Sequence, residues 1–362
     1  MPETNTASAP QWIATRVEME AYAAATSSGK RLALDTEFIR TQTFFAELGL
    51  VQLAGGEHIG LVDPLVPELI PALAKLIADP ELIKIVHSAS EDLEVIAHAL
   101  GVVPAPLFDT QIAAVLCGYE QPPSYQKLVA QELGLNLDKQ ATRTDWLKRP
   151  LDLEQLRYAA EDVVHLEALF QRLDERLESL GRRGWMAEEC MRALEKSRQP
   201  LDPYPHLKMR GAERMTPPQQ QRLWRLLHWR DREALARNRP KRWIVDNPVA
   251  MRAALLDQPE LKALETAVAA DGKPSAKLAA KLEALLRQEA TPAELAIPLL
   301  LTQTEPEKQR TKELRERALT AAKTLALNSD FLLPRRGLEH WARHDSLPED
   351  LKGWREQVLG FS

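Results

Sequence analysis

Two carboxylates placed two residues apart are the first feature of this sequence that points to chemistry. Asp35 and Glu37 lie in the stretch from Leu32 to Phe38, whose period-two alternation predicts a β-strand. Residues two apart on a strand project from the same face, so the two carboxylates would share a small volume. An isolated pair of this kind is often a solvated strand face. Because apolar runs flank this strand, a buried repelling pair that takes a divalent cation as counter-charge is also predicted.

A third acid, Asp92, lies where a predicted buried strand gives way to a predicted helix. The apolar run 82–86 predicts the strand, Ser90 is expected to cap the helix that follows, and Gly101 is expected to end it. Taken alone, Asp92 is equally well explained as an acid in the first helical turn, where it complements the helix dipole.

A tyrosine and a fourth acid share one face of another predicted helix. Tyr158 and Asp162 are four residues apart, which places them one turn apart on a helix predicted from about Leu153 to Leu180, before Gly181. With an unperturbed pKa of about 10, a tyrosine is a poor general base but a good hydrogen-bond partner for a water molecule. Taken alone, this pair, like Asp92, is weak evidence for a catalytic site.

Short strands and helices alternate over the first half of the chain and would position these residues. Period-two or apolar runs predict three strands, at 32–38, 48–54 and 58–62. Three strands in such quick succession predict an antiparallel meander. A helical pattern after Pro67, followed by the strand and helix around Asp92, extends the order to β-β-β-α-β-α. This order predicts an α/β domain in which helices cover a mixed sheet.

Beyond residue 200 the pattern becomes almost entirely helical. Prolines crowd into residues 200–205, which predicts a linker, and Thr216 begins a capping box that starts a strong helix. Polar and proline-containing stretches interrupt the helices again near residues 291–306. We therefore predict one α/β domain over 1–205 and two small all-α domains, over 208–290 and 296–362.

Composition excludes several classes of protein. The 362 residues carry 47 basic and 52 acidic side chains, a net charge of -5, so a uniformly basic coat is excluded. Two cysteines indicate a reducing compartment and leave oxygen or imidazole as the ligands for any metal. The usual motifs of P-loop, dinucleotide-binding and α/β-hydrolase enzymes are absent from the sequence, so no nucleotide cofactor is expected. Residues 1–10 do not read as a secretory signal, and apolar runs are too short to span a bilayer, which predicts a cytoplasmic protein without membrane contact.

Together, the three acidic segments resemble the exonuclease motifs of the DEDD superfamily, in the branch with tyrosine in the third motif. The surrounding segments, 48–53, 87–92 and 108–111, are similar to the ribonuclease D family. Segments 229–234, 238–242 and 246–247 resemble the helicase-and-RNase-D C-terminal (HRDC) domain, and segments 332–336 and 354–355 resemble a second HRDC copy. The resemblance covers nearly the whole chain and implies a ribonuclease H-like exonuclease domain followed by two HRDC-like domains.

The resemblance also implies an activity and a set of site residues. The activity is 3′–5′ exoribonucleolytic trimming of tRNA precursors and other structured RNAs with 3′ extensions, with release of 5′-monophosphates. The implied ligands for two divalent ions are Asp35, Glu37, Asp92 and Asp162, and Tyr158 is expected to orient the attacking water. Oxygen ligands of this kind suit Mg²⁺ or Mn²⁺, and two such ions can activate a nucleophile and cover the charge of a phosphodiester in hydrolysis.

A basic segment interrupts this acidic protein. From residue 208 to 242 there are eleven basic and three acidic residues, a local net charge of +8. Helical spacing would place cations and one aromatic on a single face that contacts phosphates or, equally, is merely solvated. The predicted nucleic-acid-binding residues are Arg222, Arg225, Trp229, Arg232, Arg239, Lys241 and Arg242, with Phe44 and Phe45 as candidates to stack a terminal base or to pack in a core.

Two other functions remain open at this level. Four carboxylates would serve a 3′–5′ DNA exonuclease of the proofreading type equally well, because the direction and RNA preference come from the resemblance. A non-catalytic RNA-binding adaptor with a relic nuclease fold is the second alternative. The intact set of acids argues against the adaptor, since a relic has no need to keep mutually repelling carboxylates together.

Overall fold

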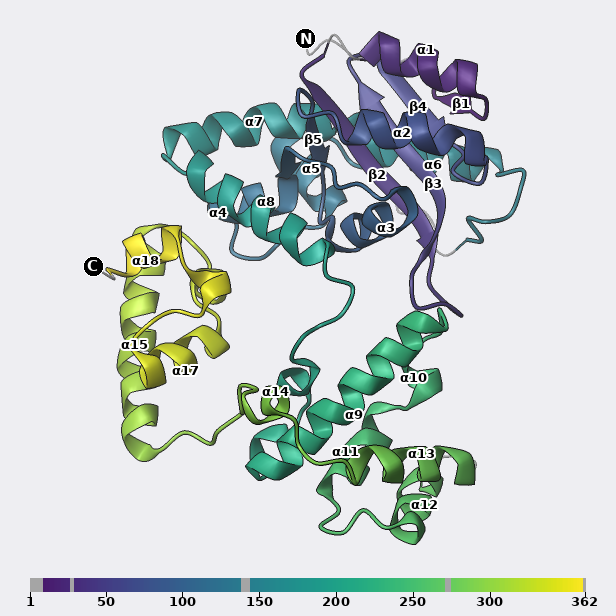
Figure 1. Cartoon of the computed structure of the whole chain (residues 1–362). Coiled ribbons are helices and arrows are strands. Elements are labelled where there is room, and N and C mark those ends of the chain that lie inside the picture. Colours follow the sequence, from purple (N-terminus) through teal and green to yellow (C-terminus); the bar gives the residue numbers. More distant parts are fainter. Residues whose placement is uncertain (1–8, 27–28, 138–143, 271–274, 361–362) are drawn as a thin grey trace. The chain divides into compact units, whose positions relative to one another are not determined.

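The computed structural model describes residues 9–26, 29–137, 144–270 and 275–360 (Figure 1). The first eight residues, on which part of the secretory-signal expectation depends, lie outside this description. Two compact units make up the chain. The first comprises Met1–Ile39, Glu47–Arg198 and Thr304–Ser362, and the second comprises Arg40–Ala46 and Gln199–Gln303.

A six-stranded sheet forms the centre of the first unit. Its strands are β1 (Gln11–Ile13), β2 (Arg31–Ile39), β3 (Glu47–Gly55), β4 (His58–Val62), β5 (Ile83–Val86) and β6 (Leu107–Asp109). Their spatial order is β1-β4-β3-β2-β5-β6, in which β2, β3 and β4 pair antiparallel and the other neighbours pair parallel. The predicted antiparallel meander and mixed sheet are therefore confirmed. The sequence analysis did not predict the edge strand β1.

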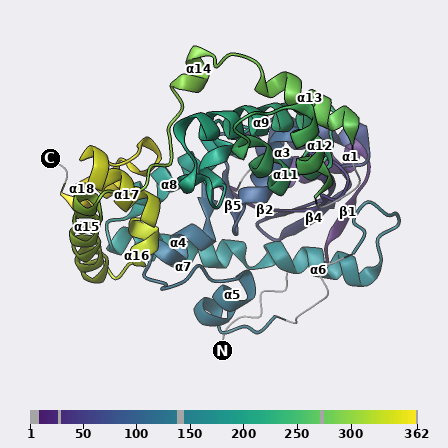
Figure 2. The same cartoon turned by 90° about the horizontal axis from the view of Figure 1, so that it is seen from below.

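Helices cover both faces of this sheet. They are α1 (Arg16–Thr26), α2 (Ile70–Ile77), α3 (Ser90–Leu100), α4 (Thr110–Leu116), α5 (Tyr125–Leu133), α6 (Leu153–Val164), α7 (Leu166–Ser179) and α8 (Arg183–Ser197). Helix α1 packs against Gly60, whereas α6 packs on the opposite face, with its apolar residues against Leu61. Figure 2 shows α6 and α7 together along one side of the strands. The face of the sheet that α6 covers is the one that carries Asp35 and Glu37.

Two details of the predicted helices are wrong. Ser90 is the first helical residue of α3 rather than its cap, and Ala89 at the cap position makes no side-chain bond. The helix predicted from 153 to 180 is broken at His165 into α6 and α7. The cause is Tyr125, whose hydroxyl accepts a hydrogen bond from the His165 N–H at 3.3 Å and donates one to the Glu161 carbonyl at 3.0 Å. A side chain inserted between groups four residues apart breaks the regular helical hydrogen bonding.

Among its described residues, the second unit contains helices and no strand, in agreement with the helical pattern predicted beyond residue 200. Its helices are α9 (Pro217–Ala236), α10 (Lys241–Ile244), α11 (Asn247–Leu255), α12 (Leu261–Ala269), α13 (Ala276–Leu286) and α14 (Pro292–Leu295). The predicted capping box of Thr216 and Gln219 starts α9, with proline at the first helical position. Leu223, Leu226 and Leu227 of α9 are buried in the core of this unit.

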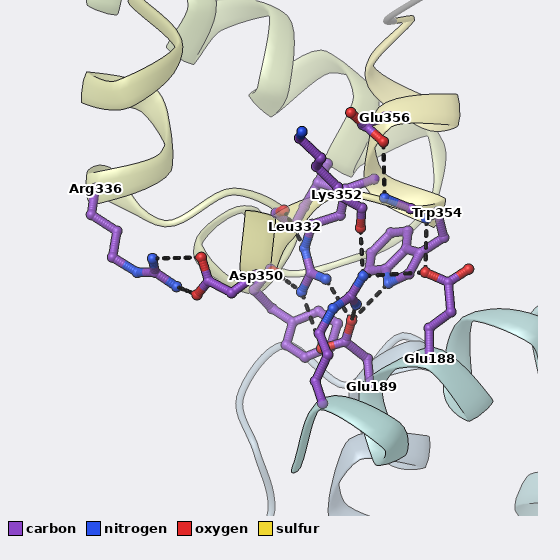
Figure 3. A network of polar contacts seen from close by, with 12 residues as sticks. Glu188, Glu189, Leu332, Arg336, Asp350, Lys352, Trp354 and Glu356 are labelled. Carbon is purple, nitrogen blue, oxygen red and sulfur yellow. Dashed lines mark hydrogen bonds and ion pairs between the residues drawn. The ribbon is translucent and has the colours of Figure 1, made fainter. Parts of the chain in front are cut away.

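The last helices of the chain belong to the first unit. They are α15 (Glu305–Thr324), α16 (Ser329–Leu332), α17 (Arg335–His344) and α18 (Trp354–Leu359). Trp354 is fully buried and stacks on Trp185 of α8 with ring centroids 4.5 Å apart. Glu189 of α8 accepts from the Trp354 indole N–H at 2.8 Å and pairs with Arg355 at 2.5 Å (Figure 3). Among the described residues no helix is both long and apolar enough to cross a membrane.

Candidate active site

Strand β2 presents the first two acids at the middle of the sheet. It pairs with β3 on one side and β5 on the other, and the register with β3 shifts between Glu37 and Phe38. Asp35 and Glu37 point to the face that α6 covers, as their spacing predicts. Both side chains keep a partly exposed edge. A central strand with a local irregularity therefore holds two carboxylates at the rim of a packed layer.

Asp92 reaches the same site from α3. It lies in the first turn of that helix, and the hydroxyl of Thr36 in β2 donates a hydrogen bond to its carboxylate. The loop before α3 is held by Asp109, which accepts from the backbone N–H groups of Ser88 and Ala89 at 3.0 and 3.1 Å. Ser88 has a φ of 58°, an unfavourable conformation for a residue with a side chain. Asp109 thus stabilises the strained turn that carries Asp92 to the sheet.

Helix α6 supplies the fourth acid and the tyrosine. Its amino end is fixed by a capping box between Asp152 and Gln155. Tyr158 and Asp162 lie one turn apart, and the tyrosine hydroxyl donates a hydrogen bond to the Asp162 carboxylate. The break after α6 at residue 165 follows directly after this turn.

All four carboxylates have raised pKa values, and burial is the largest cause for each. Burial, and after it the charges of the three other acids, raises the pKa of Asp35 well above its usual value. Burial and the charges of Asp162 and Asp92 raise the pKa of Glu37 to about 8. Burial also raises the pKa of Asp162 to about 7 and that of Asp92 to about 6. Groups that interact this strongly lie in one site, and their negative form needs a positive partner.

The chemistry of this donor set suits divalent metal ions. Carboxylate oxygens are the ligands that Mg²⁺ and Mn²⁺ prefer. Next to Asp35, Gln52 lies directly opposite in the strand register and is fully buried, yet its amide finds no hydrogen-bond partner among the described residues. A buried amide without a partner is costly, which favours a polar group in this site beyond those of the chain. Within the described ranges, no group of three or more histidine, cysteine or acidic side chains already has the geometry of a metal site.

Two histidines close in sequence to the motifs have structural roles. His87 bonds Thr110 at 2.9 Å and the Pro123 carbonyl at 3.2 Å, and its ring packs edge-on against Tyr125. His165 lies at the junction of α6 and α7. Burial lowers the pKa of both imidazoles, so they are neutral at neutral pH.

The predicted base-stacking aromatics, Phe44 and Phe45, belong to the second unit. Their rings pack edge to face with centroids 5.0 Å apart, and both backbone N–H groups donate to the side chain of Asn238, at 3.0 and 3.3 Å. The ammonium of Lys241 lies 5.5 Å from the centre of the Phe44 ring. Stacking of a terminal base by these aromatics stays a prediction.

Some of the predicted basic residues form ion pairs or hydrogen bonds within the second unit, and others stay exposed. Arg225 is largely buried and forms a two-pronged ion pair with Glu294, and Arg222 donates to the Ala254 carbonyl. Lys241 pairs with the buried Asp231 at 2.7 Å. Trp229, predicted to bind nucleic acid, packs against the core of the unit.

Three cations of the predicted set remain exposed. They are Arg232, Arg239 and Arg242. Trp243, which the sequence analysis did not single out, is also exposed, and the Arg239 guanidinium lies 5.7 Å from the centre of its ring. An exposed arginine–tryptophan pair is the combination that a single-stranded nucleic acid can use for stacking and charge.

Sequence reasoning missed the residues that support the acids. Thr36, Gln52 and Tyr125 carry no charge. The hydrogen-bond partners of Thr36 and Tyr125 lie 36 to 56 positions away, and Gln52 lies opposite Asp35 on a paired strand. The position of Thr36 between the two acids of the strand could have indicated a role in the site. The period-two rule, however, places its side chain on the other face of the strand. No local sequence pattern indicates that Gln52 or Tyr125 supports the site.

Comparisons with known proteins show which family this chain resembles. A family model for a 3′–5′ exonuclease domain matches residues 10–178. Ribonuclease D of Xanthomonas oryzae pv. oryzae is 40% identical over 351 residues, which covers 97% of this chain and 96% of that protein. Ribonuclease D of Pseudomonas paraeruginosa is 35% identical over 366 residues, with coverage of 97% and 95%.

A solved structure extends the likeness to the whole fold. The crystal structure of Escherichia coli RNase D, described as an exoribonuclease involved in structured RNA processing, matches with a TM-score of 0.83 and 29% identity. The match covers 97% of this chain and 96% of that one. On its motifs, its fold and these relatives, the chain belongs to the ribonuclease D family and is a 3′–5′ exoribonuclease whose fold implies divalent metal ions.

Proposed function

We propose that this exoribonuclease uses two divalent ions, Mg²⁺ or Mn²⁺, held by Asp35, Glu37, Asp92 and Asp162. The observation that supports the proposal is the convergence of four acids from β2, α3 and α6, in which the charges of Asp92 and Asp162 both act on Asp35 and Glu37. Bound ions of this kind supply an activated water and cover for charge on the phosphate. The carboxylates fix the ions, and the packed sheet and α6 fix the carboxylates.

The reaction is hydrolysis of the last phosphodiester of an RNA strand. The water oxygen bonds to phosphorus, and the bond to the 3′ oxygen of the preceding nucleotide breaks. One proton of the water ends on that 3′ oxygen, and a nucleoside 5′-monophosphate leaves. Burial and the neighbouring acids raise the pKa of Tyr158 further above its usual value, so Tyr158 stays protonated. Its hydroxyl orients the attacking water and does not act as the base.

The substrates we propose are tRNA precursors and other structured RNAs with 3′ extensions. The printed description of the E. coli relative, structured RNA processing, supports this class. The exposed Arg232, Arg239 and Arg242, with Trp243 beside them, would contact the body of such an RNA. Both cysteines, Cys117 and Cys190, are free thiols, which supports a reducing compartment such as the cytoplasm.

Product analysis on matched substrates tests this proposal. The purified protein is incubated with a 3′-extended tRNA and with single-stranded DNA of the same extension sequence, with Mg²⁺, Mn²⁺ or EDTA. We expect stepwise loss of the RNA extension, 5′-monophosphates as product, and no reaction in EDTA. Faster cleavage of the DNA would favour the proofreading alternative, and RNA binding without cleavage in either metal would favour the adaptor.

A further inference from the structure

Arg149 joins three parts of the exonuclease fold that are far apart in sequence. Its guanidinium forms a two-pronged ion pair with the buried Asp63, which follows β4, at 2.5 and 2.8 Å. It also donates to the Gly49 carbonyl of β3 at 2.7 Å and to the Trp146 carbonyl at 2.9 Å. The central carbon of the Arg149 guanidinium lies 5.5 Å from the centre of the Trp12 ring. The segment that precedes α6 is thereby fixed to strand β3 and to the end of strand β4.

These contacts of Arg149 help to position Trp146. It is 2% exposed, yet its indole N–H has no hydrogen-bond partner among the described residues. Its position is therefore set by packing and by the bond from Arg149 to its carbonyl. The packing is tight at Gly49, where an added Cβ would lie 2.8 Å from both the Cβ and the carbonyl oxygen of Trp146. Glycine at position 49 lets the tryptophan backbone approach β3 closely.

The indole in turn contacts the tyrosine of the active site. The rings of Trp146 and Tyr158 lie 6.2 Å apart with an interplanar angle of 35°, and both belong to an apolar cluster with Leu50 and Leu61 under α6. The tyrosine hydroxyl donates to Asp162 at the other end of the ring. Trp146 thus limits the directions that the ring can take, while Asp162 receives its hydroxyl.

We infer that Arg149 and Trp146 are positioning residues for Tyr158, with Gly49 as the close contact that seats the tryptophan. The inference rests on the proposed function, because it acts through the hydroxyl that orients the attacking water. A misplaced hydroxyl slows turnover without removing a metal ligand or a phosphate contact. The expected signature is a fall in kcat at nearly constant KM and metal affinity.

Two substitutions disturb the arrangement in different ways. Arg149→Lys keeps the charge but loses the planar fork that bonds Asp63 and two carbonyls at once. Gly49→Ala removes no polar group, but its added Cβ pushes Trp146 aside. Gly184→Ala is the matched control, because an added Cβ there meets nothing within 4 Å. Each variant is made alone and combined with Tyr158→Phe, and folding is checked by circular dichroism and thermal unfolding.

The measurement is a double-mutant cycle on kcat with a short single-stranded oligonucleotide. We expect Arg149→Lys and Gly49→Ala each to lower kcat at least about fivefold when the tyrosine is present. The same changes should lower kcat less than about twofold in the Tyr158→Phe background, because the hydroxyl they position is already gone. Mn²⁺ affinity by calorimetry should stay within about twofold of the parent in all variants. The control should change none of these quantities.

The outcomes separate the inference from the function on which it rests. If Tyr158→Phe lowers kcat but the two substitutions cost equal factors in both backgrounds, Arg149 and Trp146 do not act through the tyrosine, and the inference is wrong. If Tyr158→Phe itself leaves kcat unchanged, the proposed role of the tyrosine fails. If one variant does not fold, the other still decides between these outcomes. A loss of Mn²⁺ affinity in Gly49→Ala would assign the arrangement to the metal ligands instead.

Discussion

Each carboxylate of the site lies in surroundings that disfavour its own charge. Burial raises the pKa values of Asp35, Glu37, Asp92 and Asp162, and neighbouring acids add to the effect for Asp35 and Glu37. An enzyme that needs four acids in one place can hold them only with a positive partner. The residue types and the shared strand face follow from the sequence. Their convergence does not, because Asp92 and Asp162 come from helices whose placement depends on the whole fold.

This crowding predicts that stability and metal binding depend on pH. In the metal-free protein, the pKa of Glu37 is about 8 and that of Asp162 about 7, against about 4 in an unfolded chain. The folded state then binds more protons between these limits, so metal-free stability falls as the pH rises from about 4 to 8. Bound Mg²⁺ removes the repulsion.

Thermal unfolding with and without saturating Mg²⁺ measures this linkage. We expect the rise in Tm on adding Mg²⁺ to be larger at pH 8 than at pH 6. Asp162→Asn should reduce the difference, since it removes one of the titrating charges. An equal Mg²⁺ effect at both pH values would contradict the account of the carboxylates.

The broken helix after Asp162 is the main departure at the scale of elements. Helical periodicity runs through residues 153–180 without interruption, so a sequence reading predicts one helix. The break comes from Tyr125, 36 positions earlier than Glu161, whose hydroxyl lies between the His165 N–H and the Glu161 carbonyl. Strands β2, β3 and β4, whose pairing is local, were predicted nearly to the residue. Features that depend on side chains from distant segments were not.

Removing that hydroxyl should destabilise the junction of α6 and α7. Tyr125→Phe leaves a buried N–H and a buried carbonyl without their partner, which costs about 1–3 kcal/mol of unfolding free energy. Tyr204→Phe, at a tyrosine that is 41% exposed, is the control and should change stability little. Urea unfolding measures both. Equal stabilities for the two variants would show that the Tyr125 hydroxyl does not support the helix ends.

At the scale of the whole chain, the C-terminal helices pack within the exonuclease unit. The contacts of α8 with Trp354 and Arg355 join residues more than 160 positions apart, so no local sequence pattern predicts them. Figure 3 shows Trp354 beside Glu189, which also accepts from Arg355. The division into three domains stays a prediction. Residues 304–362 belong to the same compact unit as the nuclease fold.

Glu189 should therefore carry much of the stability of this packing. Its partner Arg355 has a side chain that is 4% exposed, and breaking such a buried pair costs about 3 kcal/mol. We expect Glu189→Gln to lower the Tm and to make residues 304–362 sensitive to limited proteolysis. Glu349→Gln removes an exposed pair with Lys352 and is the control. Protease resistance equal to the parent would show that Glu189 is not needed for the packing.

The exposed cations of the second unit predict salt-dependent RNA binding. Arg232, Arg239 and Arg242 would each release about 0.7 counterions per phosphate contact on a single strand. Replacing all three with glutamine should flatten the slope of log affinity against log salt by about 2. Hydrolysis of a short oligonucleotide at saturating concentration should stay unchanged, since the carboxylates are untouched. An unchanged slope would show that these arginines are solvated surface.

The most direct test of the carboxylate site is the rate of nucleotide release by two variants at saturating Mg²⁺. Asp35→Asn and Asp162→Asn each remove one ligand charge at nearly constant volume, so the fold should remain intact by circular dichroism. We expect release of 5′-monophosphates from a 3′-labelled RNA to fall by at least about a thousandfold in both variants. Turnover close to that of the parent in either folded variant would contradict the assignment of these acids as metal ligands.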